Sequence, residues 1–296
     1  CMKEQRLFDV QYLSLRVSLI SMNRAELSPY LGSALRGVIG QALYRTDKKT
    51  FDFLYKNGEN SGEKQDIVKP YMIVPPVACT DKRIVRQGEI LNFGIVLLGE
   101  AVKYAFALTR ALQGIYQYGL GAKRYPFVLT QIINDMDQRI LWRKEIYYRE
   151  GANASMIPCH RLSCAAGAVI RLCTPLRILR GGQLLESISF QTLIRNIINR
   201  IRRITERYGG WVDRGEAEKI QILAAEIKTV KEDLKMEPLQ RYSNRLHDKM
   251  DFSGLMGEIE YEGNLTPFIP WLSAAQILHI GRNTTFGMGR IEVYFY

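Results

Sequence analysis

Residues 274–295, AAQILHIGRNTTFGMGRIEVYF, decide the fold of the second half of this 296-residue chain. The stretch predicts the end of a helix, then a glycine-rich loop and a closing strand. From Ile291 to Phe295 apolar and polar side chains alternate, and this period of two is typical of a strand.

The glycine-rich loop is suited to binding an anion. Gly281, Gly287 and Gly289 allow positive φ angles and a close approach of the backbone to a ligand. A bend whose successive N–H groups point inward attracts anions, and four side chains supply further donors: Arg282, Thr284, Thr285 and Arg290. His279, one of only 3 histidines, stands at the entrance and can exchange a proton near neutral pH. The alternative is a glycine-bearing hairpin without a ligand, in which His279 bonds a backbone carbonyl.

The rest of the chain repeats one order of elements. The first half predicts a strand in 7–20, a helix from Ser28-Pro29, strands in 70–77 and 88–98, a helix in 101–118, and a strand from Phe127. A first glycine loop, Gly119-Leu120-Gly121 with Lys123 and Arg124, precedes that last strand. The second half predicts strands in 168–173 and 176–179 and a long amphipathic helix in 190–208, and the pattern in 220–235 fits a helix or a strand. This repeated split βαβ pattern predicts two α+β domains, residues 1–148 and 149–296.

Three local features have two interpretations each. Gly37 lies inside the first predicted helix, which indicates close packing or an approach of RNA. Residues 47–69 are polar and rich in lysine, and they predict a solvated loop or one that touches RNA. The helix in 190–208 carries arginines outside its apolar stripe, on a face that is solvated or contacts RNA: Arg195, Arg200, Arg202, Arg203 and Arg207.

Composition narrows the class of protein. Hydrophobic residues make up 47% of the chain and charged residues 24%, as in soluble globular proteins. The net charge of +11 indicates a polyanionic partner, and nucleic acid fits better than a membrane because the basic residues are spread over several elements. No apolar run is long enough to span a bilayer and no signal-peptide pattern is present, so we expect no membrane. The 5 irregularly spaced cysteines favour reduced thiols in the cytoplasm.

Several motifs together resemble one family. They are Arg241-Tyr242-Ser243-Asn244-Arg245, Lys249-Met250, Gly254-Leu255-Met256-Gly257, Tyr261-Glu262-Gly263, His279-Ile280-Gly281 and Phe286-Gly287-Met288-Gly289, with weaker similarity in the first half at Leu35-Arg36-Gly37, 71–76 and 119–121. The sequence is similar to the CRISPR-associated endoribonucleases that process precursor guide RNA, which belong to the RAMP superfamily. The resemblance implies tandem ferredoxin-like (RRM-like, βαββαβ) domains and metal-independent cleavage of CRISPR repeat RNA without a cofactor.

The resemblance also directs the search for catalytic residues. Some relatives carry a catalytic histidine in the first helix, but this chain has no histidine between Met2 and Cys159. His279 is therefore the first candidate for a catalytic residue and His247 the second. His247 can also be a phosphate contact or a plain surface residue. His160 lies beside Cys159, but no second pair of ligands has zinc spacing, so we expect no metal site. RNA contacts are expected from the two glycine loops and from Arg241, Arg245 and Lys249.

Two functions remain open from the sequence. The first is an endoribonuclease that uses the ribose 2′-OH as nucleophile and leaves a 2′,3′-cyclic phosphate and a 5′-OH. The second is a non-catalytic RAMP subunit that binds RNA inside a CRISPR interference complex. The expected partners are precursor CRISPR RNA and proteins of a CRISPR effector complex, and the chain is expected to be a monomer or a homodimer.

Overall fold

The computed structural model describes residues 6–56, 67–159, 164–243 and 248–296, with the backbone alone for 240–243 and 248–250. By its internal contacts the chain divides into two compact units. One is Gln11–Met156, here called the N-terminal unit, and the other joins Cys1–Val10 to Ile157–Tyr296, here called the C-terminal unit. The domain boundary that the sequence predicts, between residues 148 and 149, stays a prediction.

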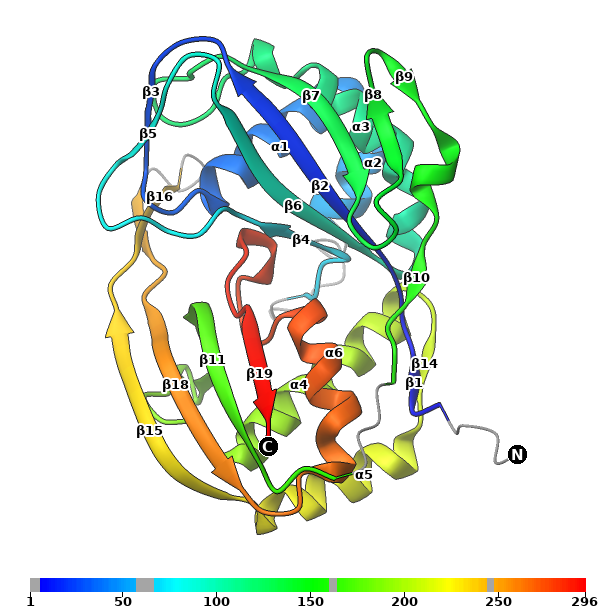
Figure 1. Ribbon diagram of the computed structural model, residues 1–296, viewed down its shortest axis with the longest axis vertical. Coiled ribbons are helices and arrows are strands. Elements are labelled where there is room, and N and C mark those ends of the chain that lie inside the picture. The colour runs from blue at the N-terminus through cyan, green and yellow to red at the C-terminus, as the bar shows by residue number, and fades with distance from the viewer. Residues whose placement is uncertain (1–5, 57–66, 160–163, 244–247) are drawn as a thin grey trace. The chain divides into compact units, whose positions relative to one another are not determined.

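The N-terminal unit contains a complete βαββαβ order. Its elements are β2 (Gln11–Ser21), α1 (Gly32–Thr46), β4 (Tyr71–Val74), β6 (Ile90–Leu98), α3 (Ala105–Gln113) and β7 (Phe127–Asn134). The strands lie in the order β4-β6-β2-β7, and every neighbouring pair is antiparallel. Helices α1 and α3 cover one face of this sheet (Figure 1).

Shorter elements complete this unit. Strands β8 (Ile140–Arg143) and β9 (Ile146–Tyr147) extend the sheet beyond β7, β10 (Ser155–Met156) pairs with β2, and β3 (Ala25–Leu27) pairs with β5 (Arg83–Val85). Helix α2 (Lys48–Phe51) continues into a π-helix, η1 (Asp52–Lys56). Three 3-10 helices are η2 (Gly99–Tyr104), η3 (Ile115–Gln117) and η4 (Arg149–Ala152).

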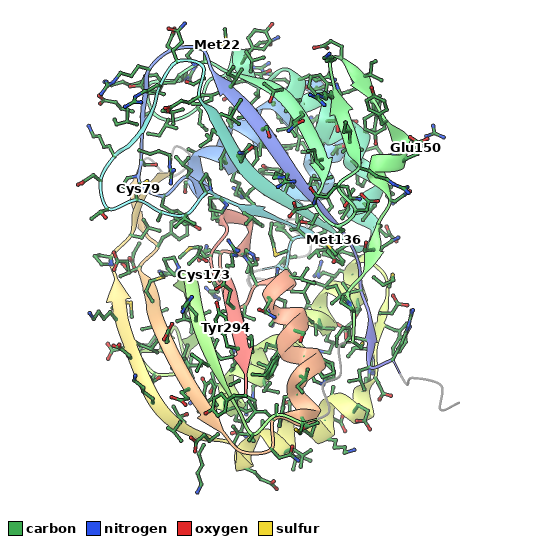
Figure 2. All side chains as sticks on the ribbon, viewed as in Figure 1. Met22, Cys79, Met136, Glu150, Cys173 and Tyr294 are labelled. Carbon is green, nitrogen blue, oxygen red and sulfur yellow. The ribbon has the colours of Figure 1, made fainter. Side chains whose placement is uncertain are left out.

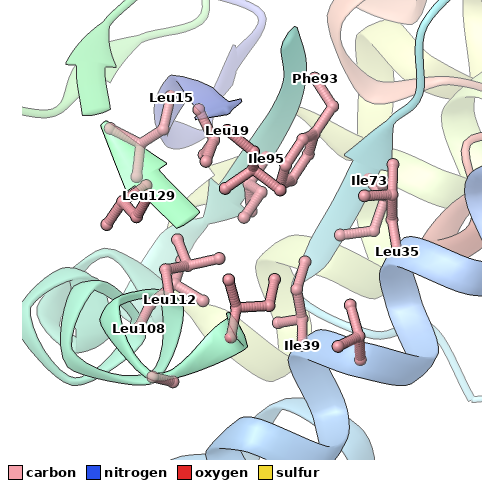
Figure 3. Close-up of a cluster of buried hydrophobic side chains, with 14 of the residues drawn as sticks. Leu15, Leu19, Leu35, Ile39, Ile73, Phe93, Ile95, Leu108, Leu112 and Leu129 are labelled. Atoms are coloured by element: carbon pink, nitrogen blue, oxygen red, sulfur yellow. The ribbon is translucent and has the colours of Figure 1, made fainter. Parts of the chain in front are cut away.

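Alternation along the strands and helical spacing in α1 and α3 create the core of this unit. Figure 3 shows strand residues facing helix residues across it, and the labelled side chains are Leu15, Leu19, Ile73, Phe93, Ile95, Leu129, Leu35, Ile39, Leu108 and Leu112. Burial of these apolar surfaces is the main favourable term that holds helices and sheet together.

The C-terminal unit repeats the same order. Its elements are β11 (Gly167–Leu176), α4 (Phe190–Tyr208), β15 (Lys228–Glu237), β18 (Gly254–Glu262), α6 (Ile269–Leu278) and β19 (Ile291–Phe295). The strand order β15-β18-β11-β19 is antiparallel throughout and corresponds position by position to that of the N-terminal unit. The prediction of an α+β fold with tandem ferredoxin-like domains is therefore confirmed.

Further elements of this unit lie around that sheet. They are β1 (Phe8–Asp9) with its partner β14 (Trp211–Val212), the hairpins β12 (Leu179–Arg180) with β13 (Gln183–Leu184) and β16 (Gln240–Ser243) with β17 (Asp248–Asp251), α5 (Arg214–Leu223), and the 3-10 helices η5 (Ala224–Glu226), η6 (Thr266–Phe268) and η7 (Thr284–Phe286). Strand β19 places Tyr294 beside β11, which carries Cys173 (Figure 2).

Two local predictions for the N-terminal unit were wrong, and one of the two interpretations of Gly37 is excluded. Helix α1 begins at Gly32 and not at Ser28-Pro29, because the Ser28 hydroxyl donates to the carbonyl of Tyr30 instead of capping a helix. Residues 48–56, predicted as part of a loop, are helical, with the Asp47 carboxylate accepting from the N–H of Thr50. A Cβ on Gly37 would meet no atom within 4 Å, so close packing does not explain this glycine.

Candidate functional site

The glycine-rich loop joins α6 to β19 and folds back on its own unit. All three of its glycines have positive φ, as predicted from the sequence. At Gly281 an added Cβ would lie 2.4 Å from the carbonyl oxygen of Arg177, and at Gly289 it would lie 1.7 Å from that of Ile280. These glycines are required because the loop packs against backbone, both its own and that of the segment after β11.

A four-residue segment at the end of β11, Thr174–Arg177, holds the loop along its length. The Thr174 hydroxyl donates to the carbonyl of Gly287 at 2.7 Å and accepts from the N–H of Arg290 at 2.9 Å. The carbonyls of Pro175 and Arg177 accept from the N–H groups of Gly289 and Arg282 at 3.0 and 2.8 Å. Several loop N–H groups that were expected to face an anion therefore donate hydrogen bonds within the protein and stabilise its fold.

His279 is the C-cap residue of α6 and its side chain lies inside the unit, which agrees with the alternative interpretation, a histidine bonded to a backbone carbonyl. Its side chain is 2% exposed, and Nδ1 lies 3.2 Å from the carbonyl oxygen of Met288. A carbonyl only accepts, so Nδ1 carries a proton and donates it to this oxygen. Burial, together with repulsion from Arg200, lowers the pKa of His279 to about 3. With this pKa the imidazole is neutral and a weak base near neutral pH.

Arg200 lies on the buried face of α4, although the sequence predicted it outside the apolar stripe of that helix. Its side chain is 7% exposed, and Nε donates to the carbonyl of Leu278 at 2.6 Å, at the C-terminal end of α6. Burial lowers the pKa of Arg200 to about 10, so the guanidinium stays charged at neutral pH. A cation at this position satisfies a terminal carbonyl and opposes the negative end of the helix dipole. The helical spacing from Ile197 to Arg200 and on to Ile204 was a signal that could have placed it in the apolar stripe.

The predicted donors of the loop differ in burial: the arginines reach the surface and the threonines do not. Arg282 is exposed and Arg290 is half-buried, with one guanidinium nitrogen 4.0 Å from Glu292. Thr284 and Thr285, which form η7 together with Phe286, are buried. Of these four predicted donors, the two arginines have side chains that reach the surface, whereas the two threonines are buried.

The other predicted RNA contacts lie in two places. Arg241 and Lys249 belong to the hairpin β16–β17, where they stand at neighbouring register positions, Arg241 opposite Met250 and Lys249 opposite Tyr242. Arg245 and His247 lie outside the described residues. Lys123 and Arg124 are exposed in the N-terminal unit, on a tight turn closed by two backbone hydrogen bonds between Leu120 and Tyr125.

Other chemistries find little support in the part of the chain that the structure describes. No group of 3 or more His, Cys, Asp or Glu residues there is arranged to hold a metal ion, and His160 lies outside it. Cys79, Cys159, Cys164 and Cys173 are free thiols. Among the described helices, none combines the length and the apolar character needed to cross a membrane.

Solved structures share this fold. A Cas6 of Thermus thermophilus has a TM-score of 0.58 at 14% identity, with 98% of this chain and 100% of that chain covered. The product complex of the same Cas6 gives 0.61 at 13%, covering 96% and 99% of the two chains. A partial Cas6-RT-Cas1–Cas2 complex gives 0.63 at 13%, covering 98% of this chain and 46% of that chain.

Family models match both halves of the sequence. One that is described as an N-terminal domain matches residues 8–157, and one described as CRISPR-associated endoribonuclease Cas6 matches residues 170–291. No curated protein matches the sequence. The second match contains the glycine-rich loop, the segment that holds it and the β16–β17 hairpin. By the sequence of residues 170–291 and by its fold, the chain is similar to the CRISPR-associated endoribonucleases of the Cas6 family.

Proposed function

We propose that this protein cuts precursor CRISPR repeat RNA without a metal ion and releases guide RNAs. The observation that carries the proposal is the match of the Cas6 endoribonuclease model to residues 170–291, because this segment contains the predicted RNA-contacting residues of the C-terminal unit. The net charge of +11 supports a polyanionic substrate.

The proposed reaction needs few groups. A base removes the proton of the ribose 2′-OH, the 2′-oxygen attacks the adjacent phosphorus, and the bond to the 5′-oxygen breaks as an acid protonates that oxygen. The products are a 2′,3′-cyclic phosphate and a 5′-OH. Cations that stabilise the charge developing on the phosphoryl oxygens supply the electrostatic part of the catalysis. In this proposal the cations are Arg282, which is exposed, and Arg290, which is half-buried.

Proton transfer is assigned to His247. Two considerations support this choice over His279, the first candidate from the sequence. The His279 ring is buried and neutral, with a pKa of about 3, whereas a general base works best with a pKa near the working pH. His247 lies in sequence between the cations Arg245 and Lys249, which can neutralise a phosphate beside it. In this assignment His279 supports the loop from inside.

The test is single-turnover cleavage of a repeat RNA by the purified protein in EDTA. We expect cleavage with a 2′,3′-cyclic phosphate end, and no cleavage of RNA with a 2′-deoxy sugar at the cut site. His247→Ala should slow cleavage by ~10²-fold or more, with His160→Ala as the matched control. Binding without cleavage, with or without metal ions, would identify a non-catalytic RNA-binding subunit. Cleavage that requires Mg²⁺ would keep the endonuclease and reject the metal-free mechanism.

RNA affinity should also depend on salt. Each phosphate contact lowers the logarithm of affinity by ~0.7 per log unit of salt for single-stranded RNA. Arg282→Ala should therefore reduce this slope by ~0.7. Arg171→Ala is the control, because Arg171 is held in ion pairs with Glu258 and Glu292 at 2.8 and 3.8 Å. Equal slopes for wild type and Arg282→Ala would exclude Arg282 as a phosphate contact.

A further inference from the structure

Arg177 directly follows β11 and is bonded to the glycine-rich loop through its backbone. Its carbonyl oxygen accepts from the N–H of Arg282 at 2.8 Å. Gly281 lies so close to the same oxygen that a side chain there would collide with it. The backbone of Arg177 therefore fixes the position of the backbone of Arg282 in the loop.

The side chain of Arg177 reaches in another direction, to the base of the β16–β17 hairpin. It is only 13% exposed, and Nη1 donates to the carbonyl of Ser253 while lying 3.7 Å from a carboxylate oxygen of Asp251. Hydrogen bonds from Ser253, with the charge of Arg177, hold the pKa of Asp251 below its usual range, so this carboxylate is ionised at neutral pH. The guanidinium carbon also lies 6.0 Å from the ring centroid of Phe252.

Phe252 makes a second connection between the base of the β16–β17 hairpin and the glycine-rich loop. Its N–H donates to the carbonyl of Leu239 at 2.7 Å, which ties together the two strands of the hairpin where they leave the sheet. Its ring lies 5.0 Å from the ring of Phe286 in the glycine-rich loop, and both rings are buried. Hairpin base and loop thus share one small core beside Arg177.

We infer that Arg177 is a positioning residue that fixes the β16–β17 hairpin relative to the glycine-rich loop, so that the hairpin and Arg282 bind the same RNA strand as one surface. The inference rests on the proposed function, since it takes Arg241 and Lys249 to be RNA contacts. Arg177 itself acts through these residues. Arginine suits the position because a planar guanidinium can donate to a carbonyl, pair with a carboxylate and lie beside a ring, whereas a lysine ammonium is a point charge.

A double-mutant cycle tests the coupling, with the dissociation constant for repeat RNA as the readout. In the wild-type background Lys249→Ala should weaken binding by about fivefold, the loss of one phosphate contact. In the Arg177→Met background the same change should cost less than about twofold, because the hairpin is no longer held in register with the loop. Arg177→Lys should restore only part of the coupling.

The matched control is Arg171→Met, which removes an arginine whose side chain bonds to Glu258 on β18 and to Glu292 and Tyr294 on β19. In that background the full effect of Lys249→Ala should return. If Arg177→Met does not fold, the cycle is run with Arg177→Lys. Losses that simply add would overturn the inference while leaving the proposed function intact. A wild-type protein that binds no repeat RNA would overturn the proposed function and this inference with it.

Discussion

His279 occupies a backbone conformation that glycine adopts far more easily, with φ 56° and ψ 168°. Such a conformation costs a non-glycine residue about 1–3 kcal/mol and persists only where the surroundings enforce it. Here Arg200 holds the preceding carbonyl of Leu278, and Met288 accepts from the imidazole. The side chain thus contributes a hydrogen bond from a site where most residues would be strained.

Burial of the neutral imidazole predicts a pH dependence of stability. The pKa of His279 is about 3 when folded, against 6.5 when unfolded, so below pH 6.5 the unfolded chain binds the proton preferentially. The free energy of unfolding should therefore fall with pH from about 6.5 towards 3, by at most ~1.4 kcal/mol per pH unit from this group. Above pH 6.5 the group should contribute no slope. Urea unfolding at pH 7, 6, 5 and 4 measures the effect.

The comparison for that experiment is His279→Asn. An asparagine amide can donate to the Met288 carbonyl, tolerates positive φ better than most residues and does not titrate. Carboxylates protonate at the acid end of the range in both proteins, so the difference between the two curves is the relevant quantity. Curves that run parallel between pH 7 and 4 would show that His279 is accessible to protons in the folded state.

At the scale of elements, a glycine in the loop cannot be replaced without strain, whereas a glycine in helix α1 can. Gly289 has φ +72° and no room for a Cβ, whereas Gly37 lies in α1 with open space around it. Gly289→Ala should destabilise the C-terminal unit by several kcal/mol, since strain and a backbone collision add. Gly37→Ala should stabilise α1 by about 0.5–1 kcal/mol, because alanine loses less backbone entropy in a helix. Thermal unfolding of both variants against wild type measures the contrast, and equal melting temperatures for Gly289→Ala and wild type would contradict it.

Sequence periodicity predicted most of these elements and failed where side chains decide the outcome. Helix α4 was predicted at 190–208, as found, because its apolar stripe is long; the structure adds that Ser189 caps it by accepting from the N–H of Thr192. The start of α1 was missed because Leu31 provides no side-chain cap. The surroundings of His279 were not predictable, since Arg200 and Leu278 meet across 78 residues of sequence. Glycine spacing alone could not indicate whether the loop packs on a ligand or on its own unit.

At the scale of the whole molecule, the C-terminal unit is discontinuous in sequence. Strand β1 pairs with β14 through Phe8 opposite Val212 and Asp9 opposite Trp211, and the N–H of Ile157 donates to the carbonyl of Val10. Residues near the start of the sequence thus belong to the unit that otherwise begins at Ile157. A strand of 2 residues is too short to produce a sequence pattern, and no periodicity could have separated it from β2.

This arrangement predicts which unit a mutation in β1 will weaken. Phe8 is buried with its ring 5.3 Å from that of the fully buried Trp271, so Phe8→Ala should cost the C-terminal unit about 3–5 kcal/mol. Partial proteolysis with mass spectrometry should then find new cuts in 164–296 while 11–156 stays protected. Phe93→Ala, in the core of the N-terminal unit, is the matched control and should reverse the pattern. Cuts that appear first within 11–156 after Phe8→Ala would show that β1 stabilises the N-terminal unit instead.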